Sequence, residues 1–304
     1  MKIKWTWGAA IVVVGVVAME LAGRFVGLGH PLLYKASVAG YEMVPNQTVN
    51  RMGKVTHINA LGTRGPQTAP LPAEGIYRIL ILGDSVAHGG TSINDDQTWP
   101  MQLQAALTKR GKPVEVVNAA AGGWAVENEA AWLAEHGALG AKLIVLEVNE
   151  KDLDQPFAGQ DVLDANVSFP SKNPSTALGE LTTRYILPRV GLGGASADPG
   201  STAGVFKPQN TSAVLGAVEK IRSVAEAQGA KFAILYWDIR LPASPQVIPA
   251  RNRLLAYAKQ HGIRVIRPDL NKDGKGGHFF RDDIHPNVEG NAAIAAALNR
   301  QLEL

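Results

Sequence analysis

The feature that most constrains this chain is a short apolar run that ends abruptly in small and polar residues. Residues 77–90 read YRILILGDSVAHGG, and the apolar run stops at Gly83. A run of this length bounded by glycine is typical of a strand buried in a parallel sheet. Ligands of open α/β sheets gather beyond the carboxyl ends of the strands, so Ser85 stands where a nucleophile would act. By itself, the tripeptide Gly-Asp-Ser is equally typical of a turn.

From residue 76 onward, predicted strands and helices alternate along the chain. We expect strands at 77–82, 114–118, 143–148, 232–237 and 264–266. We expect helices near 99–110, 127–136, 212–228, 249–261 and 288–302. Such alternation implies right-handed crossovers, and therefore a mainly parallel five-stranded sheet between two layers of helices. The predicted fold is a three-layer α/β/α sandwich that spans residues 76–304.

Two segments interrupt this pattern. Residues 29–75 are rich in glycine, proline and polar residues, and we interpret them as a tether that wraps onto the domain. Residues 154–210 contain several prolines and a glycine-rich run, which predicts an irregular insertion. Within it, the apolar cluster Tyr185-Ile-Leu is a candidate patch for docking near the site.

The N-terminus indicates a membrane anchor. Residues 5–26 read WTWGAAIVVVGVVAMELAGRFV and are long enough to cross a hydrocarbon core of roughly 30 Å as a helix. Glu20 and Arg24 are costly in lipid, but they stand four residues apart and can pair near the far interface. Lys2 and Lys4 favour an N-inside orientation, which places the rest of the chain outside the cytoplasm.

Two other interpretations of this segment remain. The small residues at Val16-Val-Ala18 suit cleavage of a signal peptide, and the segment could also be a buried core helix. We favour an uncleaved anchor over residues 1–28. The protein is then a single-pass protein of the inner membrane, with its domain in the periplasm or outside the cell.

Composition excludes several other classes of function. The chain has 304 residues and a formal net charge of only +3, with no dense basic stripe, so no nucleic-acid partner is expected. It has no cysteine, which excludes disulfides and thiolate metal sites. Its histidines are scattered without ligand spacing, so we expect no metal and no cofactor.

Catalytic chemistry depends on pairing Ser85 with a base. A serine hydroxyl is a poor nucleophile until a base accepts its proton, and His285 is the natural candidate. Asp282 lies three residues earlier, close enough to orient the imidazole and stabilise its cation. After the second strand, Gly123 leaves a backbone N–H approachable for an oxyanion. Alone, Asp-x-x-His could be a helix cap and Gly122-Gly123 a simple turn.

With these motifs in this order, the chain resembles the SGNH, or GDSL, hydrolase family. The first block matches the Gly-Asp-Ser that ends at Ser85, the second matches Asn118 and Gly123, and the last matches Asp282 and His285. The resemblance implies a flavodoxin-like SGNH fold. It also implies that Ser85 is the nucleophile, His285 the base and Asp282 its partner, with the Ser85 and Gly123 N–H groups in the oxyanion hole.

One block departs from the family pattern. After the third strand the family has Gly-x-Asn-Asp, whose asparagine side chain completes the oxyanion hole. Here Asn149 takes the asparagine position, while Glu147 replaces the glycine and Glu150 the aspartate. We expect Asn149 to be the third donor, although it could instead only end the strand in a turn. Glu147 adds bulk and charge where glycine lets the backbone come close.

A further motif precedes the domain. Asn59-x-x-Gly62-x-Arg64 resembles a segment found upstream of the catalytic domain in membrane-tethered bacterial members of the family. Arg64 could reach a carboxylate on the substrate or orient a loop near Ser85, which makes it a candidate substrate-proximal residue. The spacing alone favours a structural role, in which its stem covers apolar surface.

These observations predict a membrane-anchored, extracytoplasmic serine esterase. We expect it to hydrolyse O-acyl esters, with acetyl as the expected acyl group, on a polysaccharide or other glycan through an acyl-enzyme. Two alternatives stay open: acyl transfer to a sugar hydroxyl by the same residues, and a non-catalytic subunit of a membrane-protein complex that keeps the fold.

Overall fold

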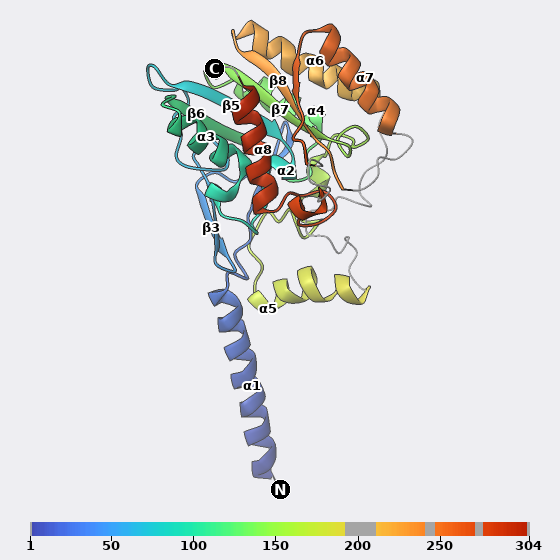
Figure 1. Ribbon diagram of the computed structural model, residues 1–304. Coiled ribbons are helices and arrows are strands. Elements are labelled where there is room, and N and C mark those ends of the chain that lie inside the picture. The colour runs from blue at the N-terminus through green and yellow to red at the C-terminus, as the bar shows by residue number, and fades with distance from the viewer. Residues whose placement is uncertain (1, 192–210, 241–246, 271–275, 303–304) are drawn as a thin grey trace.

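A five-stranded parallel sheet lies at the centre of the domain (Figure 1). The computed structural model describes residues 2–191, 211–240, 247–270 and 276–302. The strand order is β6-β5-β7-β8-β9, and every neighbouring pair is parallel. The strands are β5 (Tyr77–Gly83), β6 (Val114–Ala120), β7 (Leu143–Asn149), β8 (Lys231–Trp237) and β9 (Arg264–Ile266). The predicted sheet is therefore confirmed.

Helices cover both faces of the sheet. One face packs against α2 (Ser85–His88), α3 (Trp99–Lys109) and α8 (Val288–Gln301). The other packs against α4 (Val126–His136), α6 (Thr211–Ala227) and α7 (Val247–Gln260). Successive side chains of β5 point to opposite faces of the sheet. Ile79 and Ile81 pack into the core on the α3 face, and Leu80 and Leu82 pack into the core on the α4 face. Each predicted strand and helix is present, with ends that differ by at most two residues.

The segment between the N-terminal helix and the sheet domain contains regular structure. It forms two antiparallel hairpins, β1 (Tyr34–Ser37) with β2 (Gly40–Met43), and β3 (Gln47–Arg51) with β4 (Lys54–Ile58). Strands this short give no periodic signal in a sequence, which explains why the pattern did not predict them. Beyond β4, the Arg64 N–H donates to the Asn118 carbonyl at 3.1 Å and joins the segment to the edge strand β6.

The N-terminal helix α1 (Lys2–Phe25) projects from the domain (Figure 1). Its stretch Trp7–Phe25 is long and apolar enough to cross a membrane, and none of it is buried against the rest of the protein. The interpretation as a buried core helix is therefore wrong. Glu20 and Arg24 form the expected ion pair at 2.7 Å.

The described part of the insertion contains short helical pieces. These are η2 (Gln160–Val162), α5 (Ala177–Glu180), the π-helical η3 (Leu181–Ile186) and η4 (Pro188–Val190). Between η2 and α5, the ring of Phe169 packs against Tyr34 and Tyr41 of the first hairpin. Residues 192–210 of the predicted insertion lie outside the described residues. Two further short turns, η1 (Asp95–Gln97) and η5 (Gly276–Phe279), precede α3 and α8.

Candidate active site

Ser85 is the first residue of α2, directly after β5. The turn into the helix depends on Gly83, because a Cβ there would lie 2.8 Å from Ala87 Cβ and 3.1 Å from Glu147 Cβ. Asp84 caps the helix, and its Oδ1 accepts a hydrogen bond from Val86 N at 2.7 Å. As the first helical residue, Ser85 has a backbone N–H without an intrahelical acceptor.

The structure brings Ser85, His285 and Asp282 together, although they lie at opposite ends of the domain sequence. Ser85 Oγ lies 2.8 Å from His285 Nε2, in position to donate its proton. On the other side of the ring, His285 Nδ1 lies 2.8 Å from Asp282 Oδ2 and 3.0 Å from Oδ1. A hydroxyl, an imidazole and a carboxylate in this order can activate the hydroxyl for acyl transfer.

Asp282 also shapes the loop that carries the histidine. Its Oδ1 accepts from the backbone N–H groups of Ile284 at 2.9 Å and His285 at 2.8 Å. The buried Trp237 side chain donates to the Ile284 carbonyl at 2.8 Å and fixes the loop against β8. Partial burial alone would raise the pKa of Asp282, but the hydrogen bonds from His285 outweigh it and hold that pKa well below its usual value.

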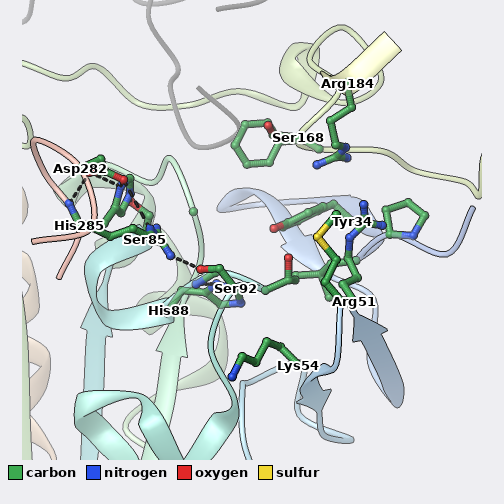
Figure 2. A pocket seen from close by; sticks show the side chains of 18 of the residues that line it. Tyr34, Arg51, Lys54, Ser85, His88, Ser92, Ser168, Arg184, Asp282 and His285 are labelled. Carbon is green, nitrogen blue, oxygen red and sulfur yellow. Dashed lines mark hydrogen bonds and ion pairs between the residues drawn. The ribbon is translucent and has the colours of Figure 1, made fainter. Parts of the chain in front are cut away.

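The three side chains open into a cleft of about 540 Å³. Figure 2 shows Ser85, His285 and Asp282 at one end, with Tyr34, Arg51 and Arg184 toward the other. The walls come from the hairpin segment, the insertion and the loop after α2. The lining includes Pro31, Leu32, Tyr34, Arg51, Met52, Lys54, His88, Gly90, Thr91, Ser92, Gly122, Ser168, Phe169, Arg184, Tyr185 and Arg281.

Two side chains that the sequence motifs do not mark fix the turn after β6. Gly122 lines the cleft, and its carbonyl accepts a hydrogen bond from the Tyr41 hydroxyl at 2.7 Å. The Gly123 carbonyl accepts from Gln155 Nε2 at 2.7 Å. Because a trans peptide holds its C=O and N–H on opposite sides, the contact with Tyr41 directs the Gly123 N–H away from that tyrosine. Gly123 has φ +76°, in the left-handed region that favours glycine.

Asn149 is adjacent to the nucleophile turn but does not line the cleft. It is fully buried, and its Nδ2 donates to Asp84 Oδ2 at 3.2 Å. Its Oδ1 accepts from Lys151 N at 2.9 Å. Only one of its two amide hydrogens has an acceptor among the described residues. Glu150 turns away from this region and accepts from Ile239 N at 3.1 Å.

Four buried carboxyl groups surround this amide: Asp84, Glu129, Glu147 and Asp152. Both oxygens of Glu129 and of Glu147 make no hydrogen bond to a described residue. Burial raises the pKa of Glu147 well above its usual value, and the charges of Asp84 and Asp152 raise it further. Burial and the charge of Asp84 raise the pKa of Glu129 and of Asp152 in the same way. Glu147, which stands at the glycine position of the family pattern, therefore adds bulk, but its carboxyl group favours the neutral form.

Arg64 lies behind the site and not in it. Its guanidinium donates to Asp95 Oδ1 at 2.8 Å and to the carbonyls of His88, Gly90 and Ile93 in the loop after α2. With a fifth bond to Thr56 Oγ1, all its N–H groups are used, and it does not line the cleft. The geometry therefore fits the loop-orienting alternative and leaves no donor of Arg64 for a substrate.

His88 lines the cleft but is a buried, neutral side chain. Its Nδ1 accepts from Gly90 N at 3.1 Å. Burial, together with the charge of Arg64, lowers its pKa to about 3. It therefore adds no positive charge beside Ser85 at neutral pH.

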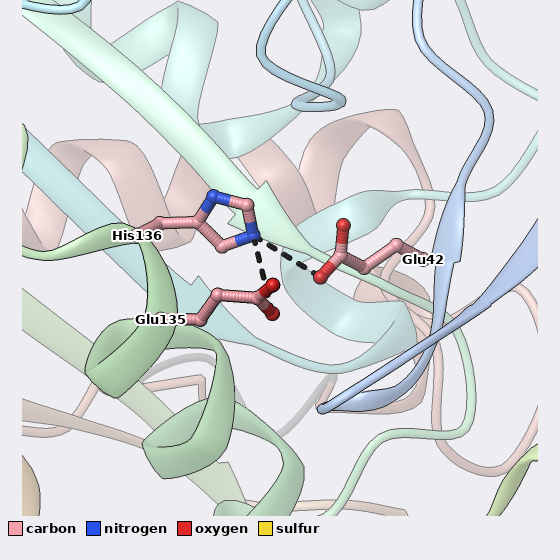
Figure 3. Close-up of side chains that lie close together, drawn as sticks. All are labelled: Glu42, Glu135 and His136. Atoms are coloured by element: carbon pink, nitrogen blue, oxygen red, sulfur yellow. Dashed lines mark hydrogen bonds and ion pairs between the residues drawn. The ribbon is translucent and has the colours of Figure 1, made fainter.

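Among the described residues, one group of side chains has the spacing of metal ligands: Glu42, Glu135 and His136 (Figure 3). His136 Nε2 lies 3.1 Å from Glu42 Oε1 and 3.9 Å from Glu135 Oε2. The His136 ring also stacks on Trp132 at 4.5 Å between centroids. These contacts tie β2 to the last turn of α4, and ion pairing accounts for them without a metal.

Comparison with known proteins agrees with this geometry. A sequence profile described as "GDSL-like Lipase/Acylhydrolase family" matches residues 81–293. The chain belongs to this family and is a serine esterase of the SGNH type, as the motifs predict. No curated protein sequence matches the chain.

Solved structures with a similar fold include TesA and two esterases. TesA is 20% identical over 73% of this chain and 95% of its own, with a TM-score of 0.46. The esterase EstA from Pseudoalteromonas sp. is 13% identical, covering 73% and 94%, with a TM-score of 0.45. The acetylxylan esterase Axe2 from Geobacillus stearothermophilus is 11% identical, covering 75% and 95%, with a TM-score of 0.47. These likenesses concern the fold alone.

Proposed function

We propose that this protein is a membrane-anchored, extracytoplasmic esterase that hydrolyses O-acyl esters, with acetyl groups on a glycan as the expected substrate class. The observation that carries the proposal is the contact of 2.8 Å between Ser85 Oγ and His285 Nε2 inside a cleft. The volume of about 540 Å³ is in the range that accommodates a sugar unit with its acyl group.

In the proposed acylation step, Ser85 Oγ attacks the ester carbonyl while His285 Nε2 accepts the hydroxyl proton. Asp282 holds the ring through Nδ1 and stabilises the imidazolium. The tetrahedral intermediate then collapses, the alcohol takes the proton from His285, and the acyl group stays on Ser85. A water molecule, deprotonated by His285, releases the acid in the second step.

We assign the oxyanion hole to the backbone N–H groups of Ser85 and Gly123, with Asn149 as the third donor. Support comes from the free N–H at the start of α2 and from the Tyr41 contact that fixes the peptide before Gly123. Asn149 would use its second amide hydrogen while the first stays on Asp84. One such donor is typically worth about 10²–10³ in turnover.

We further propose that residues 1–28 stay attached as the anchor, residues 29–75 wrap the domain, and residues 76–304 form the hydrolase domain. The contacts of the last turns of α1 support this division, because Glu20 accepts from Ala177 N at 2.9 Å and Leu178 N at 3.0 Å. Cleavage after Ala18 would remove the helix that positions Glu20. The basic Lys2 and Lys4 support an N-inside orientation in the inner membrane.

Labelling with a fluorophosphonate probe tests the catalytic assignment. The wild-type protein should be labelled, and the Ser85→Ala variant should not. Absence of labelling in the folded wild-type protein would refute the esterase mechanism and favour a non-catalytic role. Analysis of products with an acetylated sugar donor and an added glycan then separates hydrolysis, which releases acetate, from transfer to a sugar hydroxyl.

A further inference from the structure

Exposed apolar side chains occur at the end of the anchor helix and along the insertion segment that begins beside it. Phe25, the last residue of α1, is 92% exposed, and Met52 is 61% exposed. Met52 is next to the anchor, because its N–H donates to the Val26 carbonyl at 2.8 Å. Two more exposed apolar residues, Ile186 (46%) and Val190 (60%), come from the insertion. Large exposed apolar groups that gather from distant segments mark a binding surface.

The insertion residues belong to one helical stretch that starts against α1. We call residues 177–190, which comprise α5, η3 and η4, the crosswise segment, since they run across the end of α1 (Figure 1). Glu20 of α1 caps its first turn through the N–H groups of Ala177 and Leu178. A Cβ on Gly23 would lie 2.9 Å from Ala177 Cβ, so glycine at this position lets the two helices touch. The anchor is therefore docked to the segment and fixes its direction.

The buried face of the crosswise segment packs against the domain and the last turns of α1. Glu180 is 3% exposed and binds Gly29 N at 2.6 Å, just beyond the end of α1. It also pairs with Arg51 at 2.8 Å and with Arg184 at 3.2 Å. Figure 1 shows the domain on one side of the segment and the length of α1 on the other, so the opposite face of the segment looks toward the membrane-spanning part. That face carries Thr182, Thr183, Ile186 and Val190, all exposed.

We propose that the crosswise segment lies on the surface of the bilayer that α1 enters, so that the partner of this apolar surface is lipid. A helix that presents apolar side chains at the level where a membrane span ends is suited to the interface. Exposed Arg189 adds a positive charge that suits phosphate headgroups. The contact between the segment and α1 fixes the position of the segment relative to the bilayer surface.

This placement brings the cleft to the membrane. Arg184 and Tyr185 line the cleft, and they alternate along the crosswise segment with the residues that face the bilayer. The cleft is therefore separated from the bilayer by about one helix diameter, roughly 10–12 Å. We infer that its substrate is an ester on a molecule embedded in the same bilayer, such as a lipid-linked glycan. This second part rests on the proposed esterase function.

Fluorescence quenching tests the membrane placement in the full chain. The chain has no cysteine, so Ile186→Cys and Val190→Cys can each carry a single bimane label. Lys109→Cys is the matched control, because it is exposed in the last turn of α3, at the sheet edge opposite to Ser85. The variants are reconstituted in vesicles of phosphatidylethanolamine and phosphatidylglycerol, and quenched with spin-labelled lipid or aqueous iodide.

We expect the lipid quencher to act on labels at 186 and 190 and not at 109, while iodide shows the reverse order. Equal quenching by iodide at all three positions would overturn the placement. Labels at 186 and 190 that neither quencher reaches would indicate a protein contact, and would also overturn it.

A matched pair of substrates tests the second part. An acetylated octadecyl glycoside enters the vesicles, whereas the acetylated methyl glycoside stays in solution. For the reconstituted wild type, kcat/KM should be at least about tenfold higher on the embedded ester, because both partners share one surface. Ile186→Asp should reduce this preference and leave hydrolysis of the soluble ester unchanged. Equal rates on both esters would overturn the substrate inference. If neither ester nor p-nitrophenyl acetate is cleaved, the esterase function fails, while the quenching result still decides the placement.

Discussion

Replacing the buried Glu147 by glutamine should stabilise the protein at neutral pH. The side chain is fully buried beneath the turn that carries Ser85, and no hydrogen-bond donor of a described residue reaches its oxygens. Burial raises its pKa well above the ordinary 4.5, with Asp84 and Asp152 contributing. The folded protein therefore keeps a proton on Glu147 that the unfolded chain has already lost.

The size of the effect follows from proton linkage. A folded pKa above the unfolded value means that the folded state binds more protons, so stability is greatest below pH 4.5 and falls as the pH rises. The loss from this one group is about 1.4 kcal/mol per pH unit until the folded pKa is reached. Glutamine has nearly the same size and no charge, so the Glu147→Gln variant should lose this slope. Glu129 and Asp152 keep their own contributions.

Urea unfolding of the full chain in nanodiscs, at several values between about pH 5 and about pH 8, measures how the free energy of unfolding changes with pH. We expect the curve of Glu147→Gln to be flatter than that of the wild type by about 1.4 kcal/mol per pH unit. Glu74→Gln, at an exposed position, is the matched control and should leave the curve unchanged. A wild-type slope that persists in Glu147→Gln would refute the assignment of a protonated carboxyl at this site.

Three further substitutions test the site. Tyr41→Phe removes the hydrogen bond to the Gly122 carbonyl, so kcat on p-nitrophenyl acetate should fall about three- to tenfold with little change in KM; an unchanged kcat would contradict the positioning role. Asp282→Asn should lower kcat by about 10³-fold or more. The pKa of Asp282 is depressed below its ordinary 3.8, so the wild-type protein loses the stability contributed by the ionised carboxylate as the pH falls below that value. Acid unfolding of the Asp282→Asn variant should lack this pH-dependent loss of stability. Arg64→Lys leaves loop carbonyls without donors, so it should cost about 2–3 kcal/mol in urea unfolding; a cost near zero would contradict the loop-orienting role.

The central sheet was predictable because its three central strands, β5, β7 and β8, are buried on both faces over most of their length. The sequence of a strand buried on both faces is a continuous apolar run, and the run that ends at Gly83 is the clearest example. The amphipathic helices between the strands have the period of one buried face. In a parallel sheet the carboxyl ends of all strands lie at the same edge. Ser85 and the loop that carries His285 both lie at this edge, so the sheet brings the two motifs together.

The walls of the cleft were not predictable in the same way. The hairpin strands are four or five residues long, too short for a period to appear. Tyr41 acts on Gly122 through a contact between residues 81 positions apart, and nothing local in either stretch indicates it. The environment of Asn149 depends on carboxyl groups from three separate segments, so its bond to Asp84 is a product of packing.

Chemistry and substrate choice therefore reside in different parts of this chain. The family motifs bring Ser85, His285 and Asp282 together at the carboxyl edge of a rigid sheet. The hairpins and the crosswise segment supply Tyr34, Arg51 and Tyr185 to the cleft. The second hairpin and the crosswise segment are also bonded to the N-terminal helix and the residues that follow it. The elements that form these walls of the cleft therefore also hold the N-terminal helix, which ties the position of that helix to the shape of the cleft.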